Sequence, residues 1–68
     1  MEAGWTLIYT TTQSFEAELI KQNLLNHNIE AVILNKRDST YTTFGELEVY
    51  IKDEDKAEAL NLIKEFEN

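Results

Sequence analysis

The sequence predicts an α+β fold of ferredoxin-like order, β-α-β-β-α, in which two helices lie on one face of a three-stranded sheet. Three segments have the composition or the alternation of β-strands, and two segments carry apolar residues at helical spacing. These segments follow one another in the order strand, helix, strand, strand, helix. The 68 residues suffice for a single domain, residues 1–68.

The first predicted strand is the segment WTLIYTT, Trp5–Thr11, which is rich in aromatic and β-branched residues. Strict alternation would put two sets of side chains on opposite sides of the strand. One set is Trp5, Leu7 and Tyr9, and the other is Thr6, Ile8 and Thr10. Both sides are partly apolar, so the sequence leaves open which side faces the core.

The first helix is predicted over residues 14–27. Ser14 or Thr12 can cap its N-terminus, and glutamates in the first turns suit the positive end of the helix dipole. The predicted apolar stripe consists of Ala17, Ile20 and Leu24, with Leu25 beside them, and Phe15 and Leu19 widen it. Asn28 stands where a helix often ends in the left-handed conformation, which asparagine tolerates well.

Two further strands are predicted at residues 29–35 and 45–51. The first of them, IEAVILN, is a nearly continuous apolar run. The second, GELEVYI, alternates, with Leu47, Val49 and Ile51 on one face and Glu46, Glu48 and Tyr50 on the other. This alternation is typical of a strand with one buried face and one wetter face.

The last predicted element is a helix that begins near Asp53, which is the expected N-cap. Acidic residues in its first turn favour the helix N-terminus electrostatically. Its apolar residues match the helical template at positions i, i+3, i+4 and i+7, and they are Ala59, Leu62, Ile63 and Phe66, with Leu60 beside them.

The predicted topology leaves part of the sheet uncovered. A right-handed crossover makes the first two strands parallel. The third strand then runs antiparallel to the second, and the ferredoxin-like fold places it in the centre, giving the order 1-3-2. The edge of the first strand and one sheet face stay open, which proteins commonly manage with charge or with a partner. The residues expected on a homo-oligomer face are Trp5, Tyr9, Glu48 and Tyr50.

The net charge of −7 weighs against two classes of partner. Nucleic acids and anionic membranes both require lysine and arginine to neutralise their charge, and this chain has only six. No run approaches the ~20 apolar residues that span a bilayer. The N-terminus lacks the pattern of a signal peptide, and the chain has no cysteine. We therefore expect a cytoplasmic protein that binds neither nucleic acid nor membrane.

The sequence offers no constellation for catalysis or for metal binding. His27 is the only histidine, and at the end of a helix it commonly complements the dipole. Glu46 and Glu48 fit a solvated strand face. The acidic run 53–55 lacks the spacing of a calcium loop and fits a helix N-terminus. We expect no enzymatic activity, no metal and no cofactor.

The segment 35–46 is the leading candidate for a binding site, because hairpin loops usually have 2 to 5 residues and longer ones are disproportionately functional or mobile. Lysine and arginine can hold an anion there, and aromatic residues can supply apolar contact. The predicted site residues are Asn35, Lys36, Arg37, Asp38, Ser39, Tyr41 and Phe44. A plain connection, or a loop partly absorbed into a longer hairpin, is the alternative.

The whole chain resembles a small bacterial family labelled putative prokaryotic signal-transducing proteins. The resemblance covers residues 5–66 and rests on the elements EAELIK, an isoleucine before an apolar strand, and LNKRDSTYTTFGELEVY. The family often has Asn-Pro where this chain has Gln13-Ser14, and glycine where it has Asn28. These departures concern helix ends.

The resemblance implies a ferredoxin-like domain of the PII nitrogen-regulator type. Proteins of that type are ligand sensors that associate through sheet surfaces. Their loop between the second and third strands docks partners and is modified on a tyrosine, and Tyr41 occupies the same topological place here.

The sequence thus predicts a small non-enzymatic binding or regulatory module. In the first hypothesis, it recognises a small anionic ligand or a protein partner through the loop of residues 35–46. In the second, it is a homo-oligomeric interaction domain that uses the open sheet face and the free edge of the first strand.

Overall fold

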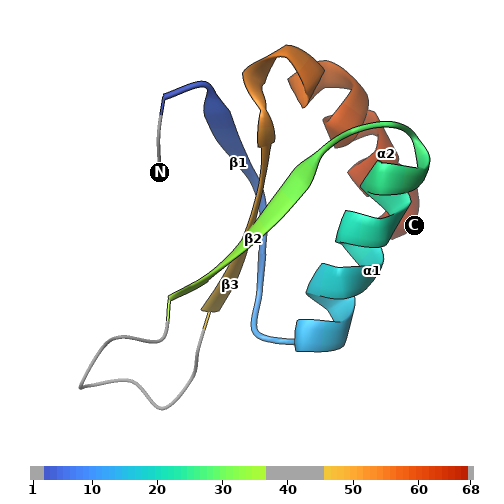
Figure 1. The fold of residues 1–68 in the computed structure, drawn as a ribbon. Helices are drawn as coiled ribbons and strands as arrows, with labels where there is room; N and C mark the ends of the chain where they lie inside the picture. Colours follow the sequence, from blue (N-terminus) through green and yellow to red (C-terminus); the bar gives the residue numbers. More distant parts are fainter. Residues whose placement is uncertain (1–2, 37–45, 68) are drawn as a thin grey trace.

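The computed structural model describes residues 3–36 and 46–67. Its elements are β1 (Trp5–Thr11), α1 (Ser14–Asn26), β2 (Ala31–Lys36), β3 (Glu46–Lys52), the short 3-10 helix η1 (Asp53–Asp55) and α2 (Lys56–Glu67). The strands form one sheet in the order β1-β3-β2, and the two helices lie on one of its faces (Figure 1). The predicted ferredoxin-like α+β fold is therefore confirmed. No helix in the described ranges is long and apolar enough to cross a membrane.

Strand β3 is the centre of the sheet and runs antiparallel to both neighbours. Its residues Val49 and Ile51 are fully buried, and Leu47 is partly buried. These three side chains point toward the helices, as the alternation predicts, because residues two apart in a strand share a face. The opposite face of β3 carries Glu46, Glu48, Tyr50 and Lys52.

A β-bulge in β1 overturns the simple alternation expected for that strand. Leu7 pairs with Tyr50 and Tyr9 pairs with Val49, so Ile8 is an extra residue in the ladder. Directly paired residues share a face, so the bulge puts Tyr9 on the buried side with Val49. Tyr9 and Ile8 both pack against the hydrophobic core. The expectation that Tyr9 shares a side with Trp5 and Leu7 is wrong.

The core lies between the sheet and the two helices. Its buried members are Ala17, Ile20, Leu24, Ile29, Ala31, Val49, Ile51, Ala59 and Ile63. The central residues of both predicted helical stripes are thus confirmed, but Leu25 and Leu60, expected beside them, are 42% and 44% exposed. Phe15 and Leu19, expected to widen the stripe of α1, are instead 66% and 50% exposed. They project from α1 on the side away from the sheet, since they lie about half a turn from Ala17 and Leu24.

The C-terminus of α1 is a Schellman motif, which explains why the chain turns sharply into β2. The Ile29 N–H donates to the Leu24 carbonyl over 2.9 Å, and the Asn28 N–H donates to the Leu25 carbonyl over 3.0 Å. Asn28 has a φ of 64°, so the predicted left-handed residue is confirmed. Leu24 and Ile29 are both buried in the core, which adds the apolar contact that usually accompanies this motif.

The start of α1 differs from the prediction. The N-cap is Gln13, and no side chain makes a capping hydrogen bond at this end, so neither Ser14 nor Thr12 is the cap. Thr11 organises the turn instead. Its hydroxyl accepts a hydrogen bond from the Gln13 N–H at 3.0 Å and donates to Glu16 Oε1 at 2.5 Å. A buried threonine at the end of a strand thus connects β1 to the first turn of the helix.

Asp53 is not the N-cap expected from the sequence, because it lies in η1 and the N-cap of η1 is Lys52. Its carboxylate accepts a hydrogen bond from the Thr6 hydroxyl, and its N–H donates to the Gly4 carbonyl over 2.8 Å. Gly4 has a φ of 99°, a conformation that side chains disfavour. These bonds tie the beginning of β1 to the end of β3.

Candidate functional site

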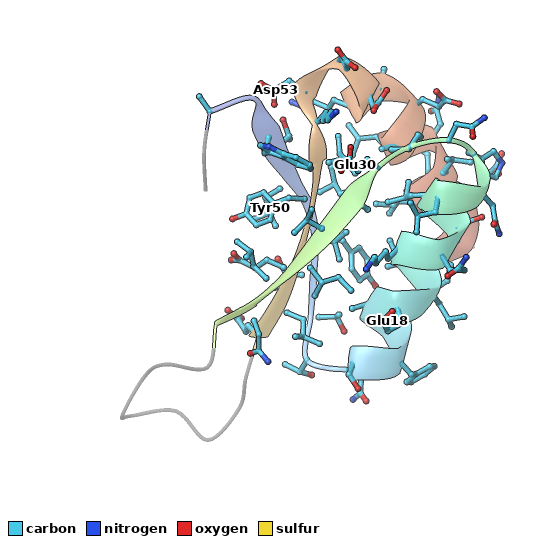
Figure 2. All side chains as sticks on the ribbon, in the orientation of Figure 1. Glu18, Glu30, Tyr50 and Asp53 are labelled. Atoms are coloured by element: carbon cyan, nitrogen blue, oxygen red, sulfur yellow. The ribbon has the colours of Figure 1, made fainter. Side chains whose placement is uncertain are left out.

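The face of the sheet opposite the helices, here termed the open face, presents a central apolar row across all three strands. Tyr50 of β3 pairs with Leu7 of β1 on one side and with Val32 of β2 on the other. Leu7 is 44% exposed, and Val32 and Tyr50 are partly buried by their neighbours. Figure 2 shows Tyr50 on the side of the sheet away from α1 and α2.

Two mixed rows flank the central row. Toward the end of β3, Lys52 pairs with Trp5, and its ammonium lies 3.2 Å from Glu30 Oε1 of the segment that enters β2. Toward the start of β3, Glu48 lies between Thr10 of β1 and Leu34 of β2. The open face therefore has a lysine near one end of β3, a tyrosine in the middle and a glutamate toward the other end.

Glu48 is held in place by Tyr50, whose hydroxyl donates a hydrogen bond to Glu48 Oε1 over 2.9 Å. This hydrogen bond, with smaller contributions from desolvation and from the negative charge of Glu48, raises the pKa of Tyr50 above its ordinary value of 10.0. All three effects favour the protonated phenol, because ionisation would place a phenolate beside a carboxylate.

We expect Tyr50 to keep its proton at a pH where a tyrosine of the unfolded chain has lost it. The contribution to stability is therefore complete below about pH 10 and is lost as the pH rises through the pKa of the folded protein. The difference in absorbance at 295 nm between the protein and a Tyr50→Phe variant would report the titration. Glu48→Gln should move the midpoint down toward 10, and an unchanged midpoint would contradict the assignment of the shift to Glu48.

Three of the four residues predicted for an oligomer face lie on the open face, namely Trp5, Glu48 and Tyr50. Tyr9 does not, because the bulge turns it toward the helices. The sequence reasoning missed Leu7, Val32, Leu34 and Lys52. The apolar run 29–35 was a usable signal for Val32 and Leu34, because a strand that is apolar on both sides has to present some of that surface on the uncovered face.

The residues predicted for loop recognition are only partly described. Asn35 and Lys36 belong to β2, where they pair with Leu47 and Glu46, so the hairpin extends further than the predicted strand 29–35. Arg37, Asp38, Ser39, Tyr41 and Phe44 lie outside the described residues. The role assigned to this loop therefore stays a prediction.

Other candidate chemistry has structural explanations. His27 Nδ1 lies 2.9 Å from the Asn23 carbonyl oxygen, so the ring donates a hydrogen bond to the last turn of α1. In the described part of the chain, no three or more histidine, aspartate or glutamate side chains are grouped so that they could hold a metal ion. In the described part of the chain, a shallow depression adjoins the open face and is lined by Gly4, Trp5, Lys52, Asp53 and Glu54. Another shallow depression lies on α1 and is lined by Phe15, Glu18, Leu19 and Gln22.

A family model described as "Putative prokaryotic signal transducing protein" matches residues 5–67, nearly the whole chain. No curated protein and no solved structure matches. The resemblance found in the sequence is confirmed, over almost the same residues. The description gives a signalling context and names no ligand, partner or reaction.

Proposed function

The chain belongs to the family of putative prokaryotic signal transducing proteins, and on this premise we propose that it is a small non-enzymatic binding module of the cytoplasm. Its recognition surface is the open face of the sheet, and its partner is a protein. The observation that carries the proposal is the central row of Leu7, Tyr50 and Val32, which neither helix covers.

The composition of the open face supports a protein partner. The row is flanked by Trp5 at one end and Leu34 at the other, so aromatic and aliphatic side chains from all three strands form one continuous surface. Tyrosine and tryptophan are enriched where proteins meet, and exposed contiguous apolar patches mark interaction sites more often than scattered apolar residues do. Lys52, Glu48 and Glu30 give this apolar surface a polar rim.

The net charge of the chain further restricts the class of partner. With a net charge of −7, binding to nucleic acid or to an anionic membrane would begin from electrostatic repulsion. Lys52 on the open face is already paired with Glu30. A protein with its own apolar patch therefore fits the open face better than nucleic acid or an anionic membrane does. The anion-binding role of Lys36 and Arg37 remains a separate prediction with its own variant below.

The proposal is tested by recovering partners from an extract of the source cells with three variants of the tagged protein. The open-face variant is Leu7→Gln with Tyr50→Gln, and the loop variant is Lys36→Ala with Arg37→Ala and Tyr41→Ala. The matched control is Phe15→Gln with Leu19→Gln, which replaces two exposed apolar side chains on α1. Thermal unfolding of each variant confirms that it is folded.

We expect the open-face variant to lose the proteins that the wild type retains, by at least about tenfold in recovery, because central aromatic and aliphatic contacts dominate interfaces. The control and the loop variant should retain them. Loss confined to the loop variant would move the recognition site to residues 35–46, and loss confined to the α1 variant would move it to the helical layer. Either result would overturn the proposal for the open face.

A further inference from the structure

We propose that the open face binds a second copy of this chain, face to face, with the β3 strands antiparallel and the two-fold axis passing between the two Tyr50 side chains. This inference rests on the proposed function, since it names the partner of the same surface. It is argued from the charge layout of the face, which is complementary to itself in one orientation and repulsive in the other.

The pairing register determines what such an axis brings together. An axis that lies in the plane between the sheets, along the row of Leu7, Tyr50 and Val32, places this row on its own copy. The two Tyr50 rings then meet at the centre in an offset arrangement. The row that contains Trp5 and Lys52 lies over the row that contains Thr10 and Glu48 of the second copy.

In this orientation each Lys52 faces the Glu48 of the other copy, so two ion pairs form symmetrically about Tyr50. Facing sheets pack about 10 Å apart, a separation that a lysine and a glutamate can span together. Glu48 already accepts the Tyr50 hydroxyl through Oε1, and a carboxylate has two oxygens with room for a second donor. Lys52 likewise has three donors, so it can contact Glu30 and the second copy at the same time.

The other face-to-face arrangement has its axis parallel to β3 and is disfavoured by charge. It would superimpose like ends of the strands, so Lys52 would face Lys52 and Glu48 would face Glu48. Like charges set against each other across an interface are strongly unfavourable, and this selects the antiparallel arrangement.

The area available on the open face is small, which favours a weak dimer. Strand β3 has seven residues, which span roughly 20 Å, and three strands with their side chains are roughly 15 Å wide. The footprint of one face is therefore roughly 300 Å², so the two faces together are smaller than a standard specific interface and fall in the range of weak, transient contacts. Each copy also carries a net charge of −7, which opposes association until salt screens it. We therefore expect a weak dimer in exchange with monomer, with a dissociation constant of roughly 1–100 μM at about 0.15 M salt.

The test is a pair of charge reversals studied alone and mixed. Lys52→Glu alone would set the introduced carboxylate against Glu48 in both pairs of the dimer. Glu48→Lys alone would set the introduced ammonium against Lys52 in both pairs. Analytical ultracentrifugation of the purified protein at a fixed salt concentration of about 0.15 M should show each variant dimerising about 10- to 100-fold more weakly than the wild type. An equimolar mixture should recover a dimer, because one of the two pairs in the mixed dimer joins the two introduced charges, which are opposite, and the other joins the native Lys52 and Glu48.

Two surface variants of the helical layer provide controls for net charge. Glu18→Lys on α1 and Lys64→Glu on α2 change the charge by the same amounts at exposed positions. Glu18 lies in the helical layer, on α1 (Figure 2). Both controls should dimerise like the wild type. The mixture also excludes a purely internal effect of losing the Lys52–Glu30 pair, because that loss persists in the mixed dimer.

A wild type that stays monomeric up to about 1 mM would overturn this inference. So would a dimer that the two charge reversals leave unchanged, or one that the mixture fails to restore. The proposed function is judged separately, because recovery of another protein by the open face does not require that the purified chain bind itself.

Discussion

Replacing Leu24 by alanine is expected to lower the free energy of unfolding by about 2–5 kcal/mol, because Leu24 is fully buried between α1 and the sheet. The loss has two parts, the transfer of the removed atoms to water and the cavity that they leave. A domain of this size has a total stability of only roughly 3–10 kcal/mol. The variant should therefore lose a large fraction of the stability of the domain, and urea denaturation followed by circular dichroism measures the change.

Leu19→Ala is the matched control for this prediction. Leu19 is on the same helix and undergoes the same chemical change, but its side chain is 50% exposed. We expect its free energy of unfolding to change by less than about 0.5 kcal/mol, as at most surface positions. Equal losses at Leu24 and Leu19 would mean that α1 does not pack on the sheet through the face described.

The two leucines also show where sequence reasoning about α1 succeeds and where it fails. Spacing alone identifies Ala17, Ile20 and Leu24 as one stripe, and the structure buries all three. The spacing of apolar residues does not indicate how wide the buried stripe is, because its width depends on how much of the helix the sheet and α2 cover. A three-stranded sheet covers only a narrow part of α1, so Phe15 and Leu19 remain outside the core.

The open face was harder to predict for a different reason. The alternation of β3 correctly assigned Glu48 and Tyr50 to the uncovered side, since a regular strand repeats every two residues. In β1 one bulged residue, Ile8, breaks that period, so Tyr9 moves to the core while Trp5 and Leu7 stay outside. No local pattern in WTLIYTT marks the bulge, because every residue in it is compatible with either face.

The connection between Lys52 and α2 illustrates a third limit, which is competition between local and distant partners. Aspartate is one of the residue types preferred at the N-cap, and the acidic residues after Asp53 favour the start of a helix. In the structure, Asp53 instead bonds to Thr6 and Gly4, which precede it by more than 40 residues in the sequence. A bond across 47 residues between Thr6 and Asp53 leaves no trace in a window of neighbouring residues.

Thr11→Val is expected to lower the free energy of unfolding by about 1–3 kcal/mol, although it keeps the shape and the branching of the side chain. Thr11 is 9% exposed, and its hydroxyl bridges the Gln13 N–H and Glu16 Oε1 at the junction of β1 and α1. In the valine variant a methyl group replaces the hydroxyl, so the Gln13 N–H and the Glu16 carboxylate both lose their hydrogen-bond partner. Urea denaturation of the variant and the wild type gives the difference.

Thr11→Ser separates the hydroxyl from the packing, because serine keeps the hydroxyl and removes only a methyl group. Its loss should be clearly smaller than that of Thr11→Val if the two hydrogen bonds are what stabilises the junction. A double-mutant cycle with Glu16→Ala isolates the Thr11–Glu16 contact and should give a coupling of about 0.5–3 kcal/mol, as for residues in direct contact. A larger loss for serine than for valine would instead show that Thr11 acts through its methyl group, and that the order of the turn into α1 comes from packing against the core.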